Sequence, residues 1–232
     1  MSAETVALEQ GSDAWHAHRQ QYRNASETPA VMGLSPFVTP YQLWTYKTGR
    51  AICQQNYAMQ RGTLLEPKAR EVYESMTGLV MEPQVLVNGL YSASLDGLLL
   101  TCDYLLEIKC PMKGRESDTW RQVEAGEVPE HYWWQVQHQL LVSEAELAHF
   151  FVFDGISEGV MVEVKPEPDR WHDIFQAWAS FQRQLDTDTP PPLQENDVEL
   201  RQDREWQLAA EAYRQAKQQM DAVSECLAET KC

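Results

Sequence analysis

The stretch YSASLDGLLLTCDYLLEIKCP, residues 91–111, decides how the rest of the chain is interpreted. Its short apolar runs, separated by turn residues, are typical of strands in a buried sheet. Three charged residues, Asp96, Glu107 and Lys109, interrupt this apolar pattern. Burying a charge is costly unless the charge is paired or binds a metal ion. The three residues therefore need a common explanation.

A hairpin would bring these three charges together. A turn near Cys102 places Asp96 and Glu107 on neighbouring strands, and the two-residue period of a strand puts Glu107 and Lys109 on one face. Two adjacent carboxylates repel each other unless a cation lies between them, and their hard oxygens suit Mg²⁺, with Mn²⁺ as the alternative. The backbone carbonyl of Ile108 could be a further ligand. A metal-activated water with a lysine beside it is suited to phosphodiester hydrolysis.

The same pattern has a simpler interpretation. An Asp followed by Glu-x-Lys is short enough to arise by chance, and a Glu–Lys pair on an exposed sheet face contributes little to stability. The apolar flanks, including residues 98–100 and Leu105, favour buried strands and hence a chemical role. Gly97 also allows the backbone to turn tightly beside Asp96.

Outward from this stretch, the hydrophobic period changes several times. We expect helices within residues 13–77, strands over 79–109 with a turn at Asn88-Gly89, two helices over 115–125 and 129–142, a hairpin over 147–165, a helix over 168–185, and an amphipathic helix over 198–230. This order predicts an α/β (α+β) fold, in which helices flank both faces of a central mixed β-sheet.

Composition limits the class of protein. The 232 residues suffice for one large domain, and the N-terminus has neither a signal peptide nor any membrane-length apolar run, so a cytoplasmic protein is expected. The five cysteines form no CxxC, which argues against a disulfide framework or a zinc site. A net charge of -16 argues against indiscriminate coating of nucleic acid, although a small basic cleft remains compatible with it.

Six short blocks resemble one known family in their order along the chain. They are EQGSDAWHAHR (9–19), AS (25–26), RGTLLEP (61–67), SLDG (94–97), LEIKCP (106–111) and YWWQVQHQL (132–140). Together they resemble the lambda exonuclease family of phage-type alkaline exonucleases, within the PD-(D/E)xK nuclease superfamily. The family's core reads Ser-Pro-Asp-Gly, and Leu95 stands here in place of the proline. We expect this departure to alter a turn and leave the chemistry unchanged.

The resemblance implies a restriction-endonuclease-like core and a role for each matching position. Asp96 and Glu107, with the Ile108 carbonyl, would bind the metal, and Lys109 would position the attacking water. Three further residues join the implied catalytic set: Glu66, Gln135 and Tyr132. Without the resemblance, Glu66 and Gln135 would more simply be solvated helix residues.

The resemblance also implies a pocket for the 5′-phosphate of a DNA end. Arg19, Ser26 and Ser94 would form it, since an arginine can bind a phosphate through two parallel hydrogen bonds. Trp15 is a further DNA-contacting candidate, whose alternative is to fill a core. The family places a basic residue in the loop after this region. Residues 31–40 contain no Lys or Arg, so Lys47 or Arg50 would have to replace it.

The implied function is a metal-dependent 5′→3′ double-strand DNA exonuclease, a deoxyribonuclease that leaves mononucleotides and a 3′ single-stranded tail for phage-type recombination. The resemblance further implies a homotrimer around DNA and a single-strand annealing protein as partner. Residues 1–232 would form a single nuclease domain that ends in the 198–230 helix. The alternatives are a PD-(D/E)xK endonuclease and a non-catalytic module that binds DNA ends or protein.

Overall fold

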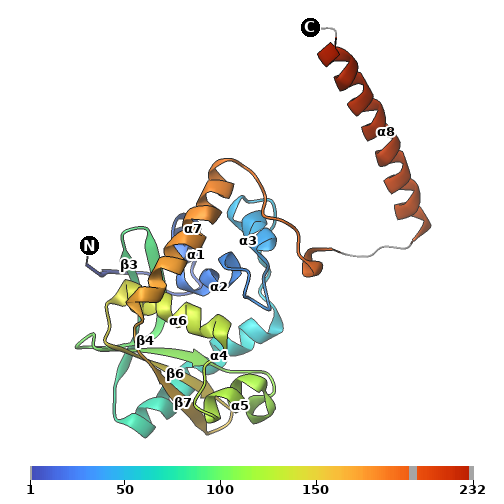
Figure 1. Ribbon diagram of the computed structural model, residues 1–232. Coiled ribbons are helices and arrows are strands. Elements are labelled where there is room, and N and C mark those ends of the chain that lie inside the picture. Colours follow the sequence, from blue (N-terminus) through green and yellow to red (C-terminus); the bar gives the residue numbers. More distant parts are fainter. Residues whose placement is uncertain (1, 199–202, 230–232) are drawn as a thin grey trace. The chain divides into compact units, whose positions relative to one another are not determined.

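The computed structural model describes residues 2–198 and 203–229, without the side chains of 224–229 (Figure 1). The chain divides into two compact units, Met1–Pro192 and Leu193–Cys232. The first unit contains the sheet and every candidate site residue named above. The second contains helix α8, Arg204–Glu229. The predicted C-terminal helix thus begins at residue 204 in the described part, while residues 199–202 and 230 lie outside it.

The first unit is built on one mixed sheet. Its described strands are β1 Glu4–Val6, β2 Arg23–Asn24, β3 Met81–Asn88, β4 Tyr91–Leu99, β5 Tyr104–Lys109, β6 Leu147–Phe153 and β7 Gly159–Val164. They lie in the order β1-β3-β4-β5-β6-β7, and β2 pairs with β4. The β5–β6 and β2–β4 pairs are parallel and the others are antiparallel. The prediction of a central mixed sheet is confirmed.

Local sequence signals determine where several helices begin and end. The helices of the first unit are α1 Asp13–Gln21, α2 Thr28–Val31, α3 Pro40–Lys47, α4 Tyr57–Thr77, α5 Asp118–Glu124, α6 Glu130–Ser143 and α7 Trp171–Asp186. The Ser12 side chain accepts a hydrogen bond from the backbone N–H of Trp15 in the first turn of α1. Thr39 begins α3 in a capping box with Gln42. Helix α4 ends at Gly78, whose φ of 73° suits a glycine.

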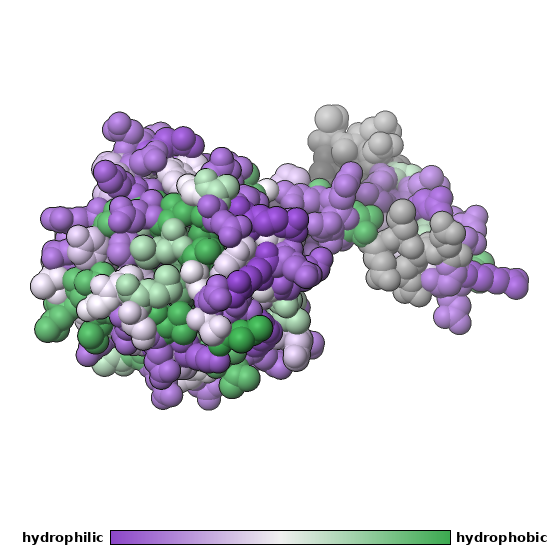
Figure 2. Space-filling model, turned by 90° about the horizontal axis from the view of Figure 1, so that it is seen from below, coloured by the Kyte–Doolittle hydropathy of each residue, from purple (hydrophilic) through white to green (hydrophobic). Residues whose placement is uncertain are grey.

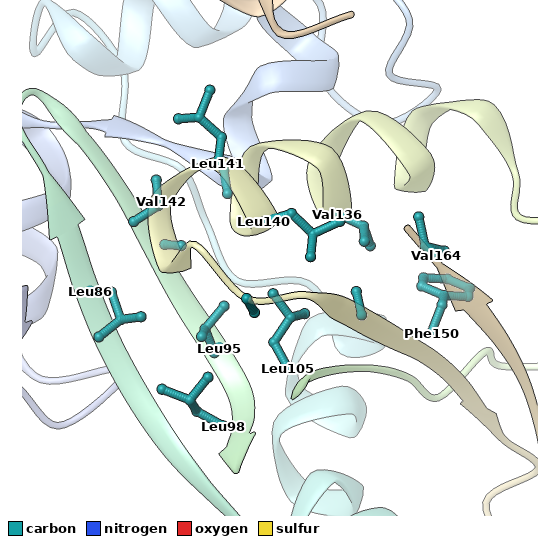
Figure 3. Close-up of a cluster of buried hydrophobic side chains, with 14 of the residues drawn as sticks. Leu86, Leu95, Leu98, Leu105, Val136, Leu140, Leu141, Val142, Phe150 and Val164 are labelled. Carbon is teal, nitrogen blue, oxygen red and sulfur yellow. The ribbon is translucent and has the colours of Figure 1, made fainter. Parts of the chain in front are cut away.

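Helices cover both faces of the sheet, as the sequence predicts. Helices α5 and α6 pack on one face, where Leu140 of α6 points toward Leu105 of the sheet (Figure 3). Helix α4 covers the other face, where Tyr73 packs with Leu106 and Ile108. A further layer of α2, α3 and α7 packs against α6 (Figure 1). Helix α6 is therefore buried between the sheet and α7, so its polar side chains must find partners inside the protein.

A β-bulge lies in β4 at Asp96 and Gly97. Leu95 pairs with Gln84 and Leu98 pairs with Glu82, so Asp96 and Gly97 together oppose one residue of β3. Leu95 and Leu98 consequently reach the same core cluster although they are three residues apart. A bulge re-aims a side chain within a strand. Here the bulge interrupts the alternation of side chains between the two faces of β4. The Asp96 carboxylate therefore turns toward β5, where it accepts the N–H of Ile108.

We expect Gly97→Ala to destabilise the protein. A Cβ at this position would lie 2.6 Å from Met81 Cβ and 3.2 Å from Leu106 Cβ, so the bulge would have to shift. Overpacking of this kind costs about 1–3 kcal/mol, or roughly 2–4 °C in Tm for each kcal/mol at this chain length. Thermal unfolding followed by circular dichroism measures the effect. Gly62→Ala is the matched control.

Gly62 lies within α4, and nothing lies within 4 Å of the Cβ that the control would add. Alanine in the interior of a helix is favoured over glycine by about 1 kcal/mol, so the control raises Tm. An unchanged Tm for Gly97→Ala would contradict the tight packing of the bulge.

The surface is mixed in character. Hydrophobic and hydrophilic residues are interspersed on the face seen in Figure 2. Within the described residues, no helix combines the length and the apolar character needed to cross a membrane. The described cysteines Cys53, Cys102 and Cys110 are free thiols, whereas the side chains of Cys226 and Cys232 lie outside the described part.

Candidate active site

The hairpin of β4 and β5 brings the three charged residues together. Gly97 pairs with Leu106 across the two strands, which places Asp96 beside Glu107. One carboxylate oxygen of Asp96 accepts a hydrogen bond from the backbone N–H of Ile108 at 2.7 Å. Lys109 donates from Nζ to Oε1 of Glu107. Both Glu107 and Lys109 face α6, as the strand period predicts.

Helix α6 supplies two amide side chains that fix Glu107. Gln135 donates to Oε1 at 2.8 Å and Gln139 donates to Oε2 at 2.5 Å. Gln139 is fully buried, also reaches the carbonyl of Ser94 at 3.4 Å, and was not among the predicted residues. The sequence does contain a signal for Gln139: Tyr132, Gln135 and Gln139 are spaced i, i+3 and i+7, so they lie on one face of a helix. The two glutamines hold the Glu107 carboxylate in a single orientation.

Tyr132 and Gln135 also line the surroundings of the Lys109 ammonium. Nζ lies 4.7 Å from the centre of the Tyr132 ring and 3.5 Å from Oε1 of Gln135. Burial by itself lowers the pKa of Lys109, but the charge of Glu107, followed by Tyr132 and Asp96, raises it above the usual lysine value. Lys109 is therefore positively charged at neutral pH and is held beside the two carboxylates.

Helix α4 brings a third carboxylate to the site. Glu66 accepts a hydrogen bond from Arg70, one turn later on the helix, at 2.6 Å. Arg70 also donates from Nε to the backbone carbonyl of Asp96 at 2.7 Å, so it ties α4 to the bulge. Sequence reasoning missed Arg70. The i, i+4 spacing of Glu66 and Arg70 is a usable signal, but it is also common on exposed helices.

The ionised carboxylates of the site repel one another. Burial raises the pKa of Asp96 well above its ordinary value, and the charges of Glu107 and Glu66 raise it further. Burial likewise raises the pKa of Glu66, where Arg70 opposes the shift and Glu107 adds to it. A divalent cation would relieve this repulsion, and the available ligands are all hard oxygens of the kind that Mg²⁺ and Mn²⁺ prefer.

The charges and donor types therefore fit a metal ion, but the side chains are not arranged around one. Among the side chains that the structure describes, those of residues 2–198 and 203–223, no group of three or more His, Cys, Asp or Glu could hold a metal ion. Both oxygens of Glu107 instead accept hydrogen bonds from Lys109, Gln135 and Gln139. The ligands that fit a cation by type are Asp96, Glu107 and the Ile108 carbonyl.

The four predicted DNA-contacting residues lie in one cluster, which includes Ser94 of the strand that carries Asp96. Trp15 of α1 donates from its indole N–H to the Ser94 hydroxyl at 2.9 Å. Arg19, one turn later, donates to the Ser26 hydroxyl at 3.1 Å, and its guanidinium lies 4.7 Å from the centre of the Trp15 ring. Ser94 precedes Asp96 by two residues on β4. Trp15 is partly exposed and hydrogen-bonded, so it does not fill a core.

The two candidates for the missing basic residue differ in position. Lys47 lies 2.8 Å from Oε2 of Glu27, whose other oxygen lies 3.0 Å from Arg19. Arg50 instead pairs with Asp188 at 2.7 Å and lies over the Trp44 ring. Only Lys47 of this pair shares an ion-pair partner with Arg19.

Comparison with known folds agrees with this architecture. An alkaline exonuclease from Laribacter hongkongensis, LHK-Exo, superposes with a TM-score of 0.62 at 24% identity, over 77% of this chain and 94% of that one. The same enzyme in complex with dAMP gives a TM-score of 0.63. A phage-related exonuclease from Haemophilus somnus gives 0.57 at 13% identity, over 72% of this chain and 94% of that one. These likenesses confirm the α/β fold, which this chain shares with the three structures.

Sequence comparison identifies the family. The YqaJ protein of Bacillus subtilis is 28% identical over 182 residues, which are 75% of this chain. The matched region spans 56% of that relative's length. The domain described as "YqaJ-like viral recombinase domain" matches residues 14–146, more than half of the chain, and these include every candidate site residue. The resemblance to phage-type recombination nucleases is thereby confirmed, and the chain belongs to the YqaJ-like viral recombinase domain family.

Proposed function

We propose that this chain is a deoxyribonuclease, a metal-dependent exonuclease that acts on the ends of linear duplex DNA. The observation that carries the proposal is the meeting of Asp96, Glu107 and Lys109 at one point. Strand β4, which carries Asp96, also carries Ser94 of the cluster that contains Arg19. Carboxylates that repel one another, a charged lysine and a nearby arginine with two hydroxyls together suit hydrolysis of a phosphodiester near a DNA end. Family membership supports the same reaction class.

In this proposal each residue has a separate role. Asp96, Glu107 and the Ile108 carbonyl would hold Mg²⁺ or Mn²⁺, which when bound makes a water more acidic and polarises the scissile phosphate. Lys109 orients that water and stabilises the negative charge that develops on the phosphate oxygens. Gln135 and Gln139 hold Glu107, and Arg70 holds Glu66 at the edge of the site. The Lys109 ammonium lies over the ring of Tyr132, which helps to hold it in place.

The proposed 5′-phosphate pocket would also set the direction of digestion. Arg19, with the Ser26 and Ser94 hydroxyls, would bind the terminal 5′-phosphate, and Trp15 would contact the end of the duplex. Because Ser94 lies only two residues before Asp96 on β4, a 5′-phosphate bound at Ser94 would bring the first internucleotide linkage near the carboxylates. The 5′-ended strand would then be cut to mononucleotides in the 5′→3′ direction, leaving a 3′ single-stranded tail. Duplexes labelled at the 5′ or the 3′ end distinguish the two directions by the first labelled product.

We expect Arg19→Ala to lose activity selectively on 5′-phosphorylated ends. A hydrogen bond to a charged partner contributes about 1.5–3 kcal/mol, so kcat/KM on 5′-phosphate ends should fall by roughly 10–100-fold. Activity on 5′-hydroxyl ends should fall much less. Initial rates on two otherwise identical duplexes measure both values. An equal loss on the two ends would refute this role for Arg19.

The wider setting is also part of the proposal. A homotrimer that encircles the duplex would retain an acidic chain on DNA by topology, and a single-strand annealing protein would load onto the 3′ tail. Light scattering of the purified protein tests the trimer. Phage-type recombination is the process that would use such a tail.

A further inference from the structure

The carboxylate of Glu27, next to the proposed 5′-phosphate pocket, lies between the cations of Arg19 and Lys47. Glu27 contacts Arg19 at 3.0 Å through Oε1 and Lys47 at 2.8 Å through Oε2. The Arg19 side chain is 21% exposed and the Lys47 side chain only 5%. Arg19 is thus the cation that an incoming ligand can reach, and Lys47 lies behind it. A phosphate that binds Arg19 must compete with Glu27 for the same guanidinium.

The Lys47 ammonium has no remaining donor for a ligand. Besides Glu27, it donates to the backbone carbonyls of Arg19 and Tyr22, the latter at 3.1 Å. A lysine ammonium has three N–H donors, and here each donor has an acceptor. Two of these acceptors lie at the C-terminal end of α1, which carries Arg19, where a positive charge is favourable to the helix. Lys47 therefore fixes the position of Arg19 without reaching the pocket itself.

We infer that Lys47 is a positioning residue for 5′-phosphate recognition, which neutralises Glu27 so that Arg19 can bind the phosphate. The inference rests on the proposed 5′-phosphate pocket. Arg19, Lys47 and Glu27 together carry a net charge of +1. Without Lys47 the net charge is zero, Arg19 is the one cation of the cluster that still pairs with Glu27, and a phosphate would meet a neutral cluster. Residues 31–40 contain no Lys or Arg. In this inference Lys47 supplies the compensating positive charge without contacting the phosphate.

The pKa of Lys47 agrees with this arrangement. Burial lowers it, and the charge and hydrogen bond of Glu27 oppose the shift. Glu27 thus helps to keep Lys47 charged, and Lys47 in turn compensates Glu27. Asn24 donates to Oε2 of Glu27 at 2.9 Å as well, but it adds no charge to the cluster.

The test is a charge-compensation series measured on duplexes with 5′-phosphate and 5′-hydroxyl ends. For Lys47→Met, the ratio of kcat/KM on the two ends should fall roughly tenfold, as expected for the loss of one unit charge from the cluster that would bind the phosphate. For the double variant Glu27→Gln/Lys47→Met, which regains a net charge of +1, the ratio should return to within about twofold of the wild-type value. For Glu27→Gln alone, it should not fall below the wild-type value.

Two outcomes overturn the inference. One is a wild-type ratio in Lys47→Met. The other is a double variant whose ratio stays as low as that of Lys47→Met, because charge balance would then not be the cause. If Lys47→Met does not fold, a lowered ratio in Glu27→Gln alone still refutes the inference. If the proposed 5′-phosphate pocket itself is wrong, Arg19→Ala will show no selective loss of activity on 5′-phosphate ends. This result distinguishes an error in the pocket from an error in the role of Lys47.

Discussion

Replacing Lys109 with Ala is expected to remove almost all cleavage activity while the protein remains folded. The variant loses the positive charge that contacts Glu107 and faces the carboxylates. Removing one preorganised group that stabilises developing charge lowers kcat by roughly 10²–10³-fold. Glu107 would still accept hydrogen bonds from Gln135 and Gln139, so its carboxylate is not left without a partner. Single-turnover cleavage of a labelled duplex measures the loss, and circular dichroism checks the fold.

Lys165→Ala is the control for the loss of one positive charge. Lys165 is an exposed residue that directly follows β7 and is outside the proposed site. Its removal should leave both the rate and Tm close to the wild-type values. Substantial cleavage by Lys109→Ala in the presence of metal would refute the assigned mechanism.

Asp96→Asn should have opposite effects on activity and on stability without metal. Burial and the two neighbouring carboxylates raise the pKa of Asp96, which means that its ionised form is unfavourable in the folded protein at neutral pH. Asparagine removes this charge, and its side-chain oxygen can still accept the N–H of Ile108. In EDTA at pH 7, Tm should therefore rise, by about 2–4 °C for each kcal/mol of repulsion removed. Cleavage should fall below detection.

Because the pKa of Asp96 is raised in the folded protein, the Tm difference between Asp96→Asn and the wild type should depend on pH. An acid whose pKa is higher in the folded state costs stability at pH values above its unfolded pKa, and the cost disappears as the pH falls below that value. The Tm advantage of Asp96→Asn should accordingly shrink in acid. Mg²⁺ or Mn²⁺ should raise the Tm of the wild type but not of Asp96→Asn. An equal rise in both proteins would show that Asp96 does not bind the metal. Asp169→Asn, at an exposed position, is the control.

Much of the fold could be predicted because its signals are local. The turn at Asn88-Gly89, the Thr39 capping box and the end of α4 at Gly78 each depend on residues adjacent in the chain. The hairpin argument for Asp96 and Glu107 is local too, since a short turn joins the two strands. Strand β1 was missed, because Glu4–Val6 has only three residues and is defined by its pairing with β3.

The rest of the site depends on tertiary packing. Gln139 becomes part of it only because α6 is buried between β5 and α7, and a glutamine on a helix is more often solvated. Arg70 likewise differs from an ordinary surface arginine only through its contact with the carbonyl of Asp96. The role of Glu27 between Arg19 and Lys47 requires α1 and α3 to meet, which no spacing in the sequence predicts.

The most direct test of the central proposal is a single digestion assay. The protein is incubated with linear duplex DNA labelled at one 5′ end and with covalently closed circular DNA, each in Mg²⁺ and in EDTA. The proposal predicts that Mg²⁺ allows the labelled strand to be released as mononucleotides, that circles remain intact, and that EDTA prevents all cleavage. Nicked or linearised circles would instead indicate an endonuclease. No cleavage of either DNA in Mg²⁺ or Mn²⁺ would contradict the proposed catalytic role of Asp96, Glu107 and Lys109.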